Sequence, residues 1–287
     1  MYKYIEMTNV FKKCLLIGIN YTGTENQLEG CIHDSDNVKN YFETNKYFDD
    51  NDMIIMNDFQ KEDLYPSKDN ILKQFDNLVN MALQNPTCDI KYVVAYSGHG
   101  TTESDPNSLV QKKHDECLCP IDCMDNGFIA DQYLKDNFVD KLPANVTLVI
   151  FVDACHSATI MDLKYCYFVD AKTKCKINAK ENTTQCNVVL ISGCKDGQTS
   201  CDAYLPYDPK FNVDADTDID PDNKSKFVHE GAMTTAFLEI YHDNILPEDL
   251  IASMRSWLKK NKFSQVPQFS SGKDLDLTQP FILASFK

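Results

Sequence analysis

Hydrophobic residues along the chain collect in short continuous runs of strand length, separated by polar or amphipathic stretches. These runs lack the alternation of a strand with one solvated face, and so they are typical of strands that are covered on both faces of a sheet. The runs are residues 13–20, 53–57, 90–97, 146–153, 187–193 and 280–285. We predict that all six form strands of one central sheet.

Between these runs, hydrophobic residues recur at the spacing of one helix face. The first stripe runs from Ile71 to Leu83, the second lies within 232–241 and the third within 250–258. Because strands and helices alternate, the pattern predicts an α/β fold with a mostly parallel sheet and helices on both faces. We see no internal repeat and no linker composition, so residues 1–287 are expected to form a single domain.

The charge balance excludes some partners. The 287 residues include 43 acidic and 28 basic side chains, for a net charge of −15, and the only arginine is Arg255. A field of this sign repels nucleic acid and anionic membrane surfaces. The N-terminus lacks the apolar core of a secretion signal, and no apolar run reaches the roughly 20 residues that span a bilayer. We therefore expect a cytoplasmic protein.

The 12 cysteines do not form a disulfide pattern, because they are scattered through a long chain without a secretion signal. We expect most of them to be reduced thiols. Cys117, Cys119 and Cys123 cluster, but a structural zinc site needs a second pair of ligands and none is near.

Two stretches lack periodicity. Residues 163–186 are rich in lysine, and residues 202–230 are rich in Asp and Pro, so both are predicted to be exposed loops. Alternating aspartates in the second stretch imitate the start of an EF-hand. That loop requires Gly at its sixth position and Glu at its twelfth, where this chain has Ile219 and Ser225. A solvated acidic loop is the better interpretation.

Candidate chemistry follows two of the predicted strands. Strand 90–97 leads into His99, and strand 146–153 leads into Cys155. Catalytic groups collect beyond the carboxyl ends of parallel strands, so these side chains face each other if the strands are neighbours. A histidine that takes the thiol proton suffices for acyl transfer by cysteine. The backbone N–H groups of Gly100 and Cys155 could hold the oxyanion of a tetrahedral intermediate.

Two other interpretations of these residues were weighed. Singly, a cysteine after a strand suits a packed thiol and a histidine between glycines suits a turn, but the joint placement favours catalysis. Phosphate transfer by a C-x5-R loop would need arginine at position 161, where the chain has Met161.

The motifs 96–100 (YSGHG) and 153–157 (DACHS) resemble the catalytic His and Cys motifs of metacaspases. Further similar segments are 13–42, 115–122 (DECLCPID), 191–203, 231–239 and 265–272. The resemblance implies a caspase-like fold (the caspase–haemoglobinase fold). It divides the domain into a large-subunit-like portion of about 1–165, an exposed linker of about 163–186 and a small-subunit-like portion of 187–287.

The resemblance also implies a cysteine endopeptidase that cleaves protein or peptide substrates after Lys or Arg. In it, His99 is the general base and Cys155 the nucleophile. The residues that match the substrate pocket are Cys31, Asp34, Ser97 and Asp153. Two carboxylates suit a cationic side chain. Caspases that recognise Asp use several arginines, which a chain with one Arg cannot supply.

The same resemblance implies activation by calcium (Ca2+). The matching ligands are Asp122, Asp131, Gln132 and Asp162. Gln132 stands where the family often has a second Asp, so weaker affinity is expected. Ala158 replaces a glycine that usually follows the Cys-His-Ser motif, which restricts the backbone there.

Self-processing of a zymogen is expected in the lysine-rich linker. The candidate sites are Lys172, Lys174, Lys176 and Lys180. A prodomain is not expected, because the first predicted strand begins early, and a monomer is expected from the resemblance. The alternatives are a silent metacaspase-like scaffold, and a separase-like or legumain-like enzyme of other specificity. The retained Cys/His pair argues against the first, and the two pocket aspartates argue against a pocket for Asn.

Overall fold

The computed structural model describes residues 9–104, 114–155, 160–168, 175–177, 183–193, 202–206, 218–219 and 226–287. Within this part of the chain, a central sheet has eight strands in the order β2-β1-β3-β7-β10-β14-β8-β9. The strands are β1 (Val10–Gly18), β2 (Met53–Asn57), β3 (Asp89–Ser97), β7 (Val146–Asp153), β8 (Tyr165–Tyr167), β9 (Cys175–Ile177), β10 (Asn187–Ser192) and β14 (Gln268–Ser271).

The first five strands of that order run parallel, and the remaining strands pair antiparallel. Five of the six strands expected from the hydrophobic runs are therefore confirmed. The prediction for residues 280–285 is wrong, because this run forms a 3-10 helix, Ile282–Phe286. β14 already occupies the position beside β10, and the turn lets Phe281, Leu283 and Phe286 all enter the core.

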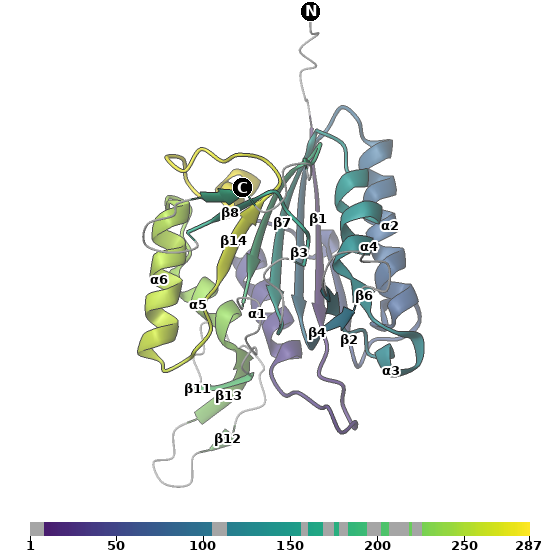
Figure 1. The fold of residues 1–287 in the computed structure, drawn as a ribbon, viewed down its shortest axis with the longest axis vertical. Helices are drawn as coiled ribbons and strands as arrows, with labels where there is room; N and C mark the ends of the chain where they lie inside the picture. Colours follow the sequence, from purple (N-terminus) through teal and green to yellow (C-terminus); the bar gives the residue numbers. More distant parts are fainter. Residues whose placement is uncertain are drawn as a thin grey trace, which may run out of the picture.

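Helices cover both faces of the sheet. They are α1 (Cys31–Thr44), α2 (Lys68–Gln84), α3 (Cys123–Asn126), α4 (Asp131–Asn137), α5 (Ala232–Ile240) and α6 (Pro247–Lys260), with 3-10 turns at Asp50–Asp52, Glu62–Leu64 and Val139–Lys141. Figure 1 shows α1, α5 and α6 on one side and α2 and α4 on the other. None of the described helices is long and apolar enough to cross a membrane.

The core consists of two layers, one on each side of the sheet. Alternate residues of one strand enter different layers: Ala95 packs with α1 and α5, whereas Tyr96 packs with α2 and α4. This confirms that the strands are buried on both faces. The helical stripes are confirmed as well, except that Leu83 is 57% exposed. Leu83 lies in the last turn of α2 at the edge of the buried stripe, since the preceding residue, Ala82, is fully buried.

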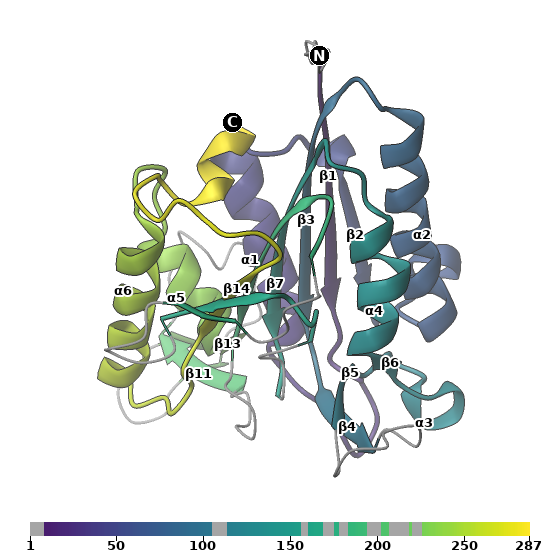
Figure 2. The same cartoon turned by 45° about the horizontal axis from the view of Figure 1, so that its top comes forward.

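Two smaller sheets lie at the carboxyl end of the central sheet, where β1, β3 and β7 finish (Figures 1 and 2). One contains β4 (Gly100–Ser104), β5 (His114–Leu118) and β6 (Ile129–Ala130). The other contains β11 (Asp202–Pro206), β12 (Asp218–Ile219) and β13 (Lys226–Gly231). The prediction of an exposed loop over 202–230 is therefore wrong in part, since 202–206, 218–219 and 226–231 form antiparallel strands. Residues 207–217 and 220–225 lie outside the described part of the chain.

The prediction of an exposed linker over 163–186 is also wrong in part. β8 pairs with β14, and Cys166, Tyr167 and Phe168 are buried against the core, because this short aromatic stretch extends the hydrophobic sheet. β9 is exposed throughout. The division into large and small portions stays a prediction.

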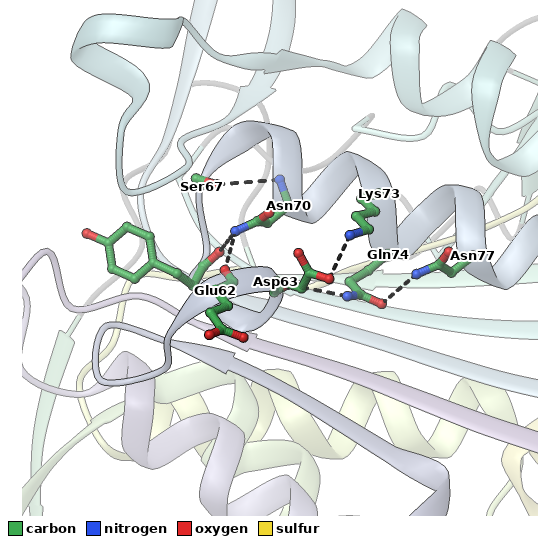
Figure 3. A network of polar contacts seen from close by, with 8 residues as sticks. Glu62, Asp63, Ser67, Asn70, Lys73, Gln74 and Asn77 are labelled. Atoms are coloured by element: carbon green, nitrogen blue, oxygen red, sulfur yellow. Dashed lines mark hydrogen bonds and ion pairs between the residues drawn. The ribbon is translucent and has the colours of Figure 1, made fainter.

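A polar network fixes the start of α2 (Figure 3). The Ser67 side chain accepts a hydrogen bond from the Asn70 N–H at 3.4 Å, the arrangement of a helix N-cap. Lys73 pairs with Asp63 at 2.6 Å, and Gln74 Nε2 donates to the Asp63 carbonyl at 3.3 Å. These contacts tie the loop after β2 to the helix, at the end of the sheet where the candidate site lies.

Candidate active site

His99 and Cys155 lie side by side at the carboxyl edge of the sheet. β3 and β7 are neighbouring parallel strands whose last residues, Ser97 and Asp153, are in register, and each candidate stands two positions further on. The Gly98 N–H donates to the Asp153 carbonyl at 3.4 Å, so the pairing continues past the strand ends. A Cβ atom on Gly100 would lie 2.0 Å from the Cys155 carbonyl oxygen, so this close approach requires glycine.

The His99 ring is oriented by the loop after β1. Its Nε2 lies 2.7 Å from the Asn26 carbonyl oxygen, and a carbonyl can only accept. Nε2 therefore carries the proton, which leaves Nδ1 as the nitrogen that can accept a proton from the Cys155 thiol. The Tyr21 ring packs against the imidazole at a centroid distance of 4.7 Å.

Two tyrosines fix the backbone of His99. Its N–H donates to the Tyr21 hydroxyl at 3.0 Å, and its carbonyl accepts from the Tyr96 hydroxyl at 2.8 Å. The Tyr21 hydroxyl in turn donates to the Cys119 carbonyl at 2.6 Å. The sequence analysis did not find these contacts, because the resemblance marks the reacting residues and gives no signal for a carbonyl such as that of Asn26.

The oxyanion donor expected at Gly100 has a suitable orientation. Gly100 and Leu118 are opposite each other in the β4–β5 ladder, and the neighbouring bond runs from the Cys119 N–H to the His99 carbonyl at 3.2 Å. This is the pattern of a pair that exchanges no hydrogen bonds, so the Gly100 N–H points away from β5. It lies on the same edge as Cys155, whose N–H is the second expected donor.

Three elements, α1, β3 and β7, carry the residues of the expected substrate pocket. Asp34 on α1 and Asp153 at the end of β7 are 2% and 4% exposed, respectively. Asp34 accepts hydrogen bonds from the Ser97 hydroxyl and, at 2.7 Å, from the Gly231 N–H. Cys31 is also buried, one helical turn before Asp34. The structure thus brings Asp34, Ser97 and Asp153 together, with Cys31 at the start of the same helix.

Asp153 is held from the opposite side by residues that the sequence analysis did not assign individually. It accepts hydrogen bonds from the Thr234 N–H at 3.0 Å, the Thr234 hydroxyl at 3.1 Å and Gln265 Nε2 at 3.4 Å. A Cβ on Gly231 would come within 2.4 Å of carboxylate oxygens of both Asp34 and Asp153. Glycine is therefore required where β13 meets the two acids.

The two carboxylates are unfavourable neighbours. Burial raises the pKa of Asp34 well above its usual value, and the charge of Asp153 raises it further. The hydrogen bonds from Ser97 and Gly231 offset only part of this. Beside the pair lies a cavity of about 20 Å³, which is too small for a lysine side chain. Its lining includes apolar residues of α1 and α5. The charged form of this pair is therefore unfavourable until a cation approaches.

The expected calcium ligands separate into two places. Asp131 is buried, and burial, followed by the charge of Asp162, raises its pKa to about 6. Asp115 adds to this rise. Asp122 lies instead at the N-terminus of α2, where its Oδ1 accepts from the Lys68 N–H at 2.8 Å. Gln132 donates from Nε2 to Asp136 along α4 at 2.9 Å.

Among the described residues, no group of three or more His, Cys, Asp or Glu side chains is arranged to hold a metal. None of the described cysteines forms a disulfide bond. Of the self-processing candidates, Lys176 lies on exposed β9, whereas Lys172, Lys174 and Lys180 lie outside the described residues, as does Ala158.

A cysteine and an oriented histidine at the ends of adjacent parallel strands are the groups that acyl transfer by a thiol requires. Residues 12–164, more than half of the chain, match the family described as metacaspase, peptidase C14 domain. The chain belongs to this metacaspase family. The predicted caspase-like fold, with a mostly parallel sheet and helices on both faces, is thereby confirmed.

Individual relatives agree with this family. Metacaspase-1 of Yarrowia lipolytica is 31% identical over 95% of this chain, which spans 64% of that relative's length. Metacaspase-5 of Trypanosoma cruzi is 29% identical over 94% of this chain, which spans 60% of it. A crystal structure of a Geobacter sulfurreducens protein is 17% identical, covers 94% of this chain and 97% of its own, and has a TM-score of 0.58, a likeness of fold.

Proposed function

We propose that this chain is a cysteine endopeptidase that cleaves peptide bonds after Lys or Arg. The observation that carries the proposal is the placement of the His99–Cys155 pair beside the buried acids Asp34 and Asp153. The first pair supplies a nucleophile and a base, and the second supplies a binding site for a cation. Family membership supports the peptidase class.

The chemistry follows from the orientation of the imidazole. Nε2 is committed to the Asn26 carbonyl, so Nδ1 takes the Cys155 thiol proton as sulfur attacks the scissile carbonyl. The N–H groups of Gly100 and Cys155 stabilise the oxyanion. The same Nδ1–H then protonates the leaving amine, and water hydrolyses the resulting thioester by the reverse sequence.

The specificity follows from the electrostatics of the two acids. A lysine or arginine head group between Asp34 and Asp153 replaces the repulsion of like charges by two charge-assisted contacts. An Asp side chain would add a third negative charge to a buried pair. Arg255, the only arginine, donates from Nη1 to the Phe168 carbonyl at 2.7 Å and from Nη2 to the Pro267 carbonyl at 2.7 Å.

Recombinant protein and fluorogenic peptides that end in Arg, Lys or Asp would test this proposal. We expect hydrolysis of the Arg and Lys peptides only, and none by a Cys155→Ala variant. Hydrolysis of the Asp peptide at an equal rate would reject the specificity. Absence of hydrolysis of all peptides, with and without calcium, would favour the scaffold alternative.

We also propose calcium activation, with Asp131 and Asp162 as ligands. Asp131 is 4% exposed, and burial together with the charges of Asp162 and Asp115 raises its pKa, so a nearby hard cation would stabilise the charged carboxylate. Bound calcium would neutralise these carboxylates. Asp122 accepts from the Lys68 N–H, which weakens the case for it as a ligand, whereas Gln132 donates only from Nε2 to Asp136 and its Oε1 is the atom that would bind calcium. Calorimetric titration of calcium should show binding that an Asp131→Asn variant loses and an Asp76→Asn variant keeps.

Self-processing at Lys172, Lys174, Lys176 or Lys180 is part of the proposal. The exposure of β9 supports access to Lys176. Mass spectrometry after calcium addition should show fragments that end at one of these lysines. Identical fragments from a Cys155→Ala variant would reject self-cleavage. We further propose a cytoplasmic monomer acting on protein substrates, which light scattering tests for the oligomeric state.

A further inference from the structure

A second cavity lies on the other side of His99 from the two acids. It has a volume of about 250 Å³. Its walls include Tyr21, His99, Ile121, Met124 and Phe128. Tyr21 belongs to the hydrophobic layer under α2 and α4, and Phe128 packs against that layer. Asp34 and Thr234 lie on α1 and α5, which cover the opposite face of the sheet.

The far wall of this cavity is held in place by the start of α2. The Ile121 N–H donates to the Pro66 carbonyl at 3.1 Å, and Asp122 accepts from the Lys68 N–H at 2.8 Å. Asp122 Oδ2 also accepts from Asn126 Nδ2 at 2.8 Å, which closes the turn of α3. The network in Figure 3 fixes the loop that precedes Lys68. The wall is therefore formed in the free protein.

The chemistry decides which part of a substrate reaches this cavity. His99 must protonate the leaving amine, so the residue after the scissile bond lies on the His99 side of the carbonyl carbon. The lysine or arginine before the bond occupies the acid pair on the other face. A peptide that crosses the edge of the sheet over Cys155 therefore enters the second cavity with its next side chain.

We propose that this cavity is a specificity subsite for an apolar side chain, such as Leu or Phe, on the residue that follows the scissile bond. The inference rests on the proposed function. Ile121, Met124 and Phe128 supply an apolar surface, and none of the described residues that line the cavity is a carboxylate or a lysine. Met124 is 81% exposed at the rim, where a bound side chain would cover it. Burial of such surface favours a larger apolar group.

Internally quenched peptides that differ only in the residue after Arg would test the subsite. The wild-type protein should cleave the Leu peptide about 10-fold more efficiently than the Gly peptide in kcat/KM, the scale set by filling an apolar pocket. Phe128→Ala should reduce this ratio to about 3-fold or less, because one wall is removed. Leu83→Ala is the matched control. It truncates an apolar side chain at the far end of α2 and should keep the ratio.

A second variant keeps the test valid if Phe128→Ala does not fold. Met124→Lys changes an exposed rim residue, and it should raise the cleavage of an Asp peptide relative to the Leu peptide by about 3-fold, as expected of an exposed ion pair. A Leu-to-Gly ratio near one in an active wild-type enzyme would overturn the subsite alone. The subsite would also be overturned if Phe128→Ala left the Leu-to-Gly ratio unchanged and Met124→Lys left the Asp-to-Leu ratio unchanged. Failure to cleave any Arg or Lys peptide would overturn the proposed function together with it.

Discussion

The two sides of the catalytic pair are built on opposite physical principles. On the α1/α5 side, buried Asp34 and Asp153 are held by hydrogen bonds from Ser97, Gly231 and Thr234. On the α2/α4 side, a larger cavity is lined by apolar and small polar groups of β4, α3 and the neighbouring loops. The first side is unfavourable when empty, because like charges are desolvated together. The cavity on the α2/α4 side carries no such electrostatic penalty, because none of its described lining residues is a carboxylate or a lysine.

This difference has a consequence for specificity. A desolvated acid pair discriminates strongly between side chains, because an occupant without a positive charge does not offset the repulsion between the two carboxylates. An open apolar cavity discriminates weakly, because each extra methylene contributes only about 0.8 kcal/mol. The residue before the scissile bond should therefore be almost fixed, and the residue after it merely preferred.

The largest expected effect breaks the acid pair. Asp34→Asn removes one charge and retains the shape, and kcat/KM for Arg and Lys peptides should fall by about 100-fold or more, the range for breaking a buried charge contact. The Leu-to-Gly ratio at the following position should stay unchanged. Asp76→Asn, an exposed change on α2, is the matched control. If the variant lost the Leu-to-Gly preference together with the activity on Arg and Lys peptides, the two pockets would not be independent.

The next effect concerns the histidine between the two pockets. Tyr21→Phe removes the acceptor of the His99 N–H and the donor to the Cys119 carbonyl, while the ring contact stays. We expect kcat to fall by about 10-fold with KM unchanged, since a buried group loses its partner. Tyr133→Phe, 42% exposed on α4, serves as the comparison. A change confined to KM would show that Tyr21 contacts substrate instead of positioning the base.

A smaller effect appears with pH. The pKa of Asp34 is raised, so the pocket loses charge at a higher pH than a free carboxyl group would, and KM for Arg peptides should rise several-fold as pH falls through that pKa. Substrate binding therefore weakens as pH falls, whereas the folded state should become more stable. Because the folded state binds the proton more tightly, the free energy of unfolding increases as pH falls. Steady-state kinetics and thermal unfolding across the acid range measure the two trends, and both should flatten in Asp34→Asn.

The smallest effect is on stability at neutral pH. Asp34→Asn removes a charge that burial and Asp153 disfavour, so the unfolding temperature should rise by about 2–4 °C, the shift that 1 kcal/mol causes in a chain of roughly this size. Calorimetry on the wild type and variant tests it. A lower unfolding temperature would indicate that the hydrogen bonds from Ser97 and Gly231 outweigh the repulsion.

Much of the fold was predictable because buried parallel strands give continuous hydrophobic runs, as in β3 and β7. The prediction of a strand over 280–285 was wrong because this hydrophobic run also lacks alternation. It buries Phe281, Leu283 and Phe286 through a 3-10 turn. β8 and β13 were missed because strands of three and six residues carry little periodic signal. Tertiary pairing with β14 and β11 decides their structure.

The proximity of His99 and Cys155 was predictable from their places after two strands, and the grouping of Asp34, Ser97 and Asp153 from the resemblance. The partners of these groups were not. Asn26 acts through its carbonyl, which any residue provides, and Thr234 approaches Asp153 only through the packing of α5. Asp122 stays a predicted calcium ligand, and its contact with the Lys68 N–H had no signal in the sequence, because a match by position among 43 acidic residues does not reveal the partners of a carboxylate.

The most direct test of the central claim labels the nucleophile. Incubation with an arginyl and, separately, an aspartyl peptide chloromethylketone, followed by intact and peptide mass spectrometry, reports both the reacting thiol and the pocket. The account predicts one adduct from the arginyl reagent, on Cys155 among the 12 cysteines, and its loss in Asp34→Asn. Labelling spread over several cysteines, or equal labelling by the aspartyl reagent, would contradict it.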